Sequence, residues 1–236
     1  MTPITMSLPP RAFLALLQLC DTALPVGAFS FSHGLETYTQ QGLIADAAML
    51  QTWLEAMLRH TVHGSHLLPV ALAYRATAAA DWGQLERLDQ RLTAMKHARE
   101  LRAASMKVGQ RLLRLAGRIW PGSAIEHLDT LWRQGRIVAH HAVVLGLLGY
   151  ELELEERVIV EGAGYQWLSG MIAAALRLLP LGQSAGQRVL TTLLTHLPAI
   201  ADDIRQQGWE DLASAAPEFD IRAMQHETLY SRLFQS

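Results

Sequence analysis

The amino-acid sequence predicts an all-α fold, a single compact domain of about ten helices over residues 1–236. The chain holds 40 Leu and 33 Ala but only 10 Val and 10 Ile. Leu and Ala favour helices, whereas β-branched residues favour strands. Apolar residues also recur at helical spacing between glycines and prolines, and no repeat or low-complexity linker divides the chain. A sheet-based enzyme fold is therefore not expected.

Three helices are expected in the first quarter of the chain. The apolar segment 11–20 forms the first, and a cluster of Asp, Pro and Gly residues ends it. A short helix follows at 33–41 and stops at Gly42. Asp46 is a suitable N-cap for a third helix, which is expected to run to about Val62.

The middle of the chain carries the clearest helical spacing. The apolar faces of the next two helices consist of Leu85, Leu88, Leu92 and Met95, then Leu101, Val108, Leu112 and Leu115. Five further helices, separated by Gly or Pro, are expected at about 123–133, 137–149, 157–178, 184–197 and 199–207.

The last stretch, 209–236, differs from the rest and is expected to form a C-terminal tail without a helix of its own. It contains a proline, scattered charges and three spaced aromatic residues, Phe219, Tyr230 and Phe234. Exposed apolar groups on such a segment need cover. The tail therefore either packs back on the domain or docks on a partner, and the sequence leaves both alternatives open.

Charge and cysteine content exclude several classes of protein. The 20 Lys and Arg residues balance 22 Asp and Glu, so the chain as a whole is not expected to bind nucleic acid. Both lysines, Lys96 and Lys107, follow methionine, which rules out a Gly-Lys-Ser/Thr phosphate loop. No apolar stretch approaches the ~20 residues of a membrane span, and no secretory signal is recognisable. The single cysteine, Cys20, fits a cytoplasmic protein.

Histidines are the only candidate metal ligands of borderline softness. On a continuous helix His60 and His63 lie about one turn apart, while His66 points away from them. His140 and His141 are adjacent, so they cannot chelate one ion together. Structural or surface histidines are the favoured interpretation, and a metal site is the alternative.

A basic helical face is the other charged feature. Lys107, Arg111, Arg114 and Arg118 follow the spacing i, i+4, i+7, i+11 and so share one face of a helix. The favoured interpretation is a solvated face, and the alternative is a site that docks an acidic protein surface. No nucleophile with a matching base is recognisable, so catalysis is not expected.

Several segments, in order along nearly the whole chain, resemble the urease accessory protein F (UreF) family. A glycine-containing and aromatic opening is followed by a histidine, aliphatic and glycine segment, then by a glutamine motif and a characteristic ending. These similar segments are 16–21, 24–30, 34–36, 134–135, 140–146, Arg177 with 181–183 and Gln187, and 226–234.

The resemblance implies a non-enzymatic, all-helical scaffold that forms homodimers. Members of the family bind a UreD-type (UreH) accessory protein, and this pair recruits the GTPase UreG. The assembly helps to insert nickel into apo-urease, and the F-type protein is viewed as coupling GTP hydrolysis to metal delivery. The resemblance therefore implies no tightly bound cofactor in this chain, with nickel as transient cargo, and no nucleic-acid or membrane partner.

The resemblance also implies partner contacts for particular residues. The family's expected contact regions predict that Tyr230, Leu233 and Phe234 bury against the UreD-type partner, with Arg232 at the rim. The turn of Gly34, Leu35 and Glu36 is predicted to face the GTPase. The remaining predicted contact residues are Gln183 and Gln187. A rival function is a nickel-binding metallochaperone that uses His60, His63 or His141.

Overall fold

Twelve α-helices build the part of the chain that the structure, a computed structural model, describes: residues 10–214 and 217–236. This range contains no strand, so the all-α prediction is confirmed. The helices are α1 (Pro10–Cys20), α2 (Leu35–Gln40), α3 (Ala47–Met57), α4 (Leu68–Ala78), α5 (Trp82–Met95), α6 (Arg99–Ile119), α7 (Ser123–Arg133), α8 (His141–Glu151), α9 (Glu156–Leu178), α10 (Gln183–Leu194), α11 (Leu197–Ile204) and α12 (Pro217–His226). No helix among the described residues has the length and apolar character needed to cross a bilayer.

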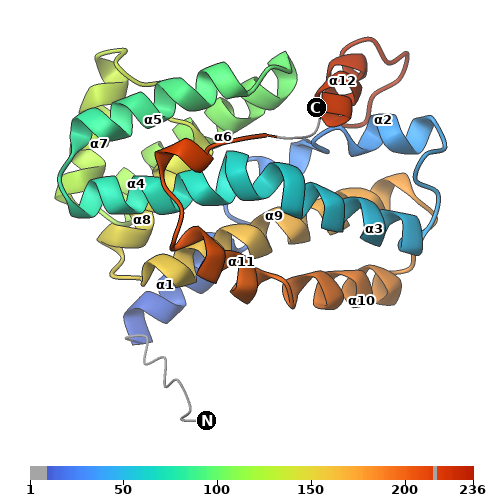
Figure 1. Cartoon of the computed structure of the whole chain (residues 1–236), viewed down its shortest axis with the longest axis horizontal. Coiled ribbons are helices and arrows are strands. Elements are labelled where there is room, and N and C mark those ends of the chain that lie inside the picture. Colours follow the sequence, from blue (N-terminus) through green and yellow to red (C-terminus); the bar gives the residue numbers. More distant parts are fainter. Residues whose placement is uncertain (1–9, 215–216) are drawn as a thin grey trace.

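The core is organised around α8, which contacts α4, α5, α6, α7 and α9. All residues of α8 from Ala142 to Gly149 are buried, as expected for a helix that is apolar on every side. In Figure 1, α3 and α4 cross the middle of the molecule, with α10 and α11 on one side and α5 to α7 on the other. This arrangement leaves α8 without a solvent-facing side.

A close crossing of α4 and α8 depends on Gly146. A Cβ atom on this residue would overlap the backbone carbonyl of Val70 and the amide of Tyr74. Because a packed backbone cannot give way cheaply, we expect Gly146→Ala to lower the free energy of unfolding by about 1–3 kcal/mol. Urea denaturation followed by circular dichroism measures the change.

The matched control for this substitution is Gly170→Ala in α9. An added Cβ there would meet no atom within 4 Å, and the backbone does not have a positive φ. The same substitution should raise stability by about 0.5–1 kcal/mol at this position, because alanine is the better helix former. Equal effects at the two sites would contradict the proposed crossing.

The third predicted helix does not end near Val62. The chain continues from α3 through a π-helical segment, Leu58–Leu67, directly into α4. Gly64 lies inside this π-helical segment, where its role is packing. A Cβ on Gly64 would overlap the backbone of Ala213, so the glycine admits a later segment that crosses the helix.

The start of α8 also differs from the sequence-based prediction of 137–149. Ala139 has a φ of 60°, and the chain enters helical geometry only at His141. The carboxylate of Asp89 accepts hydrogen bonds from the backbone amides of Val138 and His140, at 2.6 and 2.7 Å. This buried carboxylate on α5 holds 138–140 outside the helix, which local spacing does not reveal.

The prediction that 209–236 lacks a helix is wrong. A short 3-10 turn, Trp209–Asp211, and the ten-residue helix α12 lie within this stretch. Helix α12 contacts α2 and α6, and Figure 1 shows it beside α2 at one end of the molecule. Most of the described tail is therefore part of the folded domain.

Candidate functional site

The last residues of the chain pack along the segment that leads into α2. The backbone N–H of Gln235 donates to Ser30 O at 2.9 Å, and the N–H of Ser32 donates to Ser236 O at 2.7 Å. His33 and Gly34 both have positive φ, 49° and 83°, and together they turn the chain into α2. This turn sets the carboxylate of Glu36 against the final residues of the tail.

A cluster of four polar side chains, Glu36, Glu100, His226 and Arg232, joins α2, α6 and the tail, with Glu36 and His226 buried and Arg232 at the exposed edge. The ring of His226 is fully enclosed, with Nδ1 2.6 Å from Glu100 Oε2 and Nε2 3.0 Å from Glu36 Oε2. Arg232 Nη1 donates to Glu100 Oε1 at 2.8 Å. We refer to these four residues as the tail cluster.

The tail cluster is joined by hydrogen bonds to carboxylate oxygens. A carboxylate only accepts hydrogen bonds, and both ring nitrogens of His226 lie within hydrogen-bond distance of carboxylate oxygens. Glu36 also accepts hydrogen bonds from the backbone N–H groups of Leu233 and Phe234, at 2.7 and 3.0 Å. The cluster therefore attaches the tail through charge-assisted hydrogen bonds.

The predicted contact residues of the tail divide into two groups. Tyr230 is fully exposed and Leu233 is 53% exposed, so both are available on the surface. Phe234 is only 4% exposed, and the guanidinium of Arg177 lies 4.4 Å from its ring centroid. The expectation that Phe234 is an exposed anchor is wrong, because its ring packs within this chain. Arg232 pairs within the tail cluster.

The turn of Gly34, Leu35 and Glu36 is not on the surface. Leu35 is fully buried and Glu36 is 2% exposed, while Gly34 lies against Phe219 and Ala223 of α12. A direct contact between these residues and a partner would require α12 and the tail to move. The surface role predicted for them is therefore wrong in this conformation. The other two predicted contacts, Gln183 and Gln187, are exposed one turn apart on α10.

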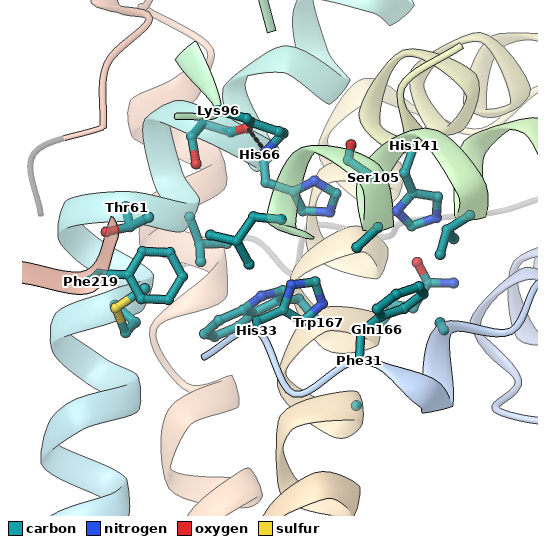
Figure 2. A pocket seen from close by; sticks show the side chains of 18 residues that line it. Phe31, His33, Thr61, His66, Lys96, Ser105, His141, Gln166, Trp167 and Phe219 are labelled. Carbon is teal, nitrogen blue, oxygen red and sulfur yellow. Dashed lines mark hydrogen bonds between the residues drawn. The ribbon is translucent and has the colours of Figure 1, made fainter. Parts of the chain in front are cut away.

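A cavity of about 120 Å³ lies between the π-helical segment, α6 and α9, and Phe219 of α12 also lines it. Figure 2 shows that the side chains of His33, His66 and His141 point into it from three separate elements, with Lys96 near His66 and Phe219 at one side. The rings of His66 and His141 stack, with centroids 5.6 Å apart. The Nε2 atom of His141 is buried without a hydrogen-bond partner among the described residues.

Burial keeps the cavity histidines neutral. It lowers the pKa of His33 to about 4 and that of His141 to about 3, and the neighbouring Lys96 acts in the same direction. Burial, helped by the charge of nearby groups, also moves the pKa of His66 well below its ordinary value. Burial lowers the pKa of Lys96 itself to about 8. At neutral pH the cavity therefore holds three uncharged imidazoles beside one ammonium group.

The structure does not bring the three predicted metal ligands together. His60 is exposed, and His63 Nε2 lies 2.8 Å from Gln207 Oε1, whereas His141 faces the cavity. Among the described residues, no group of three or more His, Cys, Asp or Glu side chains is arranged to hold a metal ion. Sequence spacing did not find the association of His33 and His66 with His141, because these residues come from distant segments.

Comparison with known proteins identifies the family. The UreF family model matches residues 44–194. The urease accessory protein UreF of Microcystis aeruginosa is 36% identical over 96% of this chain and 98% of its own length. The UreF proteins of Nostoc sp. and Paenarthrobacter aurescens are 34% and 33% identical, covering 98% and 94% of this chain and 99% and 97% of their own lengths. With this agreement along almost its whole length, the chain belongs to the UreF family of urease accessory proteins.

Proposed function

We propose that this protein is the scaffold that joins a UreD-type accessory protein to the GTPase UreG during urease maturation. Membership of the UreF family supports a role in urease maturation as an accessory protein. In the proposed assembly the chain has no catalytic activity of its own. It regulates the GTPase, so that GTP hydrolysis is coupled to the insertion of nickel into apo-urease.

The observation that carries this proposal is that the tail exposes two large apolar side chains. Tyr230 and Leu233 expose apolar surface next to the tail cluster, which fixes the backbone at Leu233. Aromatic and aliphatic anchors that are held in place lose little conformational freedom on binding. We assign these two side chains to the interface with the UreD-type partner.

Nickel enters the proposal as cargo of the assembly. The chain is proposed to bind no cofactor tightly and to act as a homodimer in the cytoplasm, without nucleic-acid or membrane partners. Gln183 and Gln187 are proposed as further partner contacts, because both side chains are exposed on one face of α10.

The proposal predicts that Tyr230→Ala/Leu233→Ala weakens binding of the UreD-type protein by about 30-fold or more. Truncation of two central anchors costs an interface roughly 2 kcal/mol or more. Isothermal titration calorimetry with the purified UreD-type protein measures the change.

The control for this experiment is Ile221→Ala/Met224→Ala, which truncates two exposed side chains of the neighbouring α12. Affinity close to that of the wild type is expected. Wild-type affinity in the Tyr230/Leu233 variant would show that the tail anchors are not the contact. No binding by the wild-type chain would contradict the scaffold function itself.

A further inference from the structure

Helix α6 carries a continuous basic face. Lys107, Arg111, Arg114 and Arg118 are all exposed, and the side of the helix that carries Val108, Leu112 and Ala116 is buried. Eleven residues at 1.5 Å each separate the first cation from the last, a distance of about 16 Å. We refer to these four residues as the α6 basic face.

These cations differ from most of the other arginines in having no ionic partner. None of the four forms an ion pair with a side chain in the described ranges 10–214 and 217–236, whereas eight other arginines do. The paired residues are Arg59, Arg75, Arg99, Arg133, Arg136, Arg157, Arg222 and Arg232. Like charges one helical turn apart repel each other, so this row of cations slightly lowers the stability of the helix.

Two of the three guanidinium groups on the α6 basic face are held in position. Arg111 Nη1 lies 3.4 Å from the backbone oxygen of Val26, and the guanidinium of Arg114 lies 4.8 Å from the ring centroid of Trp132. Stacking on an indole and a backbone contact restrict the long side chains. Preorganised donors lose less entropy when they bind a partner.

Apolar surface lies at the end of the α6 basic face. Leu14 is 63% exposed and Ile119 is 40% exposed, and both line a groove between α1 and the end of α6. Arg11 also lines this groove, while Glu151 and Glu153 contribute carboxylates to it. Arginines beside exposed aliphatic groups are typical of protein interfaces. Sites for single-stranded nucleic acid interleave aromatic side chains with the cations, and α6 itself carries no Phe, Tyr or Trp.

We propose that the α6 basic face docks an acidic protein surface, a row of Asp or Glu side chains on one member of the urease-maturation assembly. The proposal rests on the scaffold function and adds a second contact, separate from Tyr230 and Leu233. Charge complementarity is the basis for the choice of occupant: four unpaired cations in a row match carboxylates spaced along a helix or strand edge. Such a surface acts mainly on the association rate and on partner choice.

The test reverses the two charges that make no hydrogen bond or ring contact within the described chain, Lys107→Glu/Arg118→Glu. The control is Arg91→Glu/Arg205→Glu, which changes the net charge equally at exposed positions on α5 and just after α11. Each protein is titrated pairwise against the UreD-type protein, the UreG-type protein, apo-urease and a DNA duplex probe, at about 50 and about 300 mM salt. Circular dichroism verifies that both variants fold.

We expect the affinity for one of the three proteins to fall at least about tenfold at low salt, with a smaller loss at high salt. The control should retain the affinity of the wild type. Equal affinities for wild type and the Lys107/Arg118 variant would overturn the docking surface but leave the scaffold function in place. If the wild type binds none of the three, both proposals fail. If the variant loses only binding to a DNA duplex probe, the occupant is nucleic acid and the proposal is wrong.

Discussion

Lowering the pH from about 7 to about 5 should reduce the free energy of unfolding of this protein by about 6 kcal/mol. His33, His140 and His141 carry this expectation: loss of hydration lowers the pKa of His33 to about 4 and that of His140 and His141 to about 3. An unfolded chain restores them to about 6.5. Because total stabilities are about 5–15 kcal/mol, the loss is enough to unfold much of the protein.

Stability falls as the pH falls because the unfolded state binds more protons than the folded state. Below pH ~6.5 the unfolded chain takes up protons on these histidines, while the folded chain keeps them neutral down to pH 3–4. Stability is therefore complete above pH ~6.5 and is lost as the pH falls through that value. Over the interval from 7 to 5 each histidine contributes about 2 kcal/mol. His66, whose pKa burial also lowers, adds to the same loss.

Urea denaturation at several pH values measures this effect. The double variant His66→Leu/His141→Leu removes two of the titrating groups and should flatten the pH dependence, although its stability at pH 7 differs. The control is His60→Gln, which replaces an exposed histidine of the same π-helical segment as His66. A urea midpoint that does not depend on pH would contradict the expected loss of stability. If stability depended on pH as steeply in the double variant as in the wild type, the cavity histidines would not be the cause of that loss.

The cavity also shows where reasoning from the sequence reaches its limit. Helical spacing correctly predicted most elements, because apolar periodicity is a local property of the chain. The meeting of His33, His66 and His141 depends on how three distant segments pack, and no local spacing contains that information. The same holds for Asp89, which holds the segment before α8 through its backbone amides.

Helix α12 was missed for a different reason. A proline within a segment often indicates irregular structure, but Pro217 occupies the first position of the helix, where proline is favoured. Glu218 and Asp220 follow in the first turn, where acidic side chains complement the helix dipole. These two signals were present in the sequence and would have located the helix.

The resemblance placed Glu36 at a partner-facing surface, where an acidic residue is expected unless it is paired within the fold. Its partner His226 lies 190 positions later in the chain, so the pairing becomes visible only in the folded structure. The tail cluster also changes the interpretation of the family resemblance. The similar segments 34–36 and 226–234, assigned above to partner binding, contact one another within this chain.

Replacing Glu36 with alanine should therefore detach the tail and lower the free energy of unfolding by about 3–5 kcal/mol. The substitution leaves the His226 ring buried with one carboxylate instead of two, and it removes the acceptor of the Leu233 and Phe234 amides. Loss of one partner in a buried charged pair is among the most costly single changes in a protein. Unsatisfied backbone amides add to the penalty.

Hydrogen exchange at the amides of Leu233 and Phe234 distinguishes local detachment from global unfolding. In the Glu36→Ala variant, we expect exchange at these two amides to be at least about 100-fold faster, since a loss of ~3 kcal/mol corresponds to that factor. Amides in the middle of α8 should exchange only at the rate that the variant's own free energy of global unfolding allows. Glu36→Gln should behave similarly, because its amide nitrogen would face one of the N–H donors.

The control is Glu218→Ala, which removes an acidic residue from the neighbouring α12. Its side chain is 71% exposed and lies 3.6 Å from Arg222, a surface pair of small energetic value. Exchange at Leu233 and Phe234 should then match the wild type. If Glu36→Ala left both amides protected, the tail would be held by the packing of Phe234 under Arg177 rather than by the tail cluster. If they exchange rapidly, Glu36 supports partner binding indirectly, because it holds the backbone from which Leu233 is exposed.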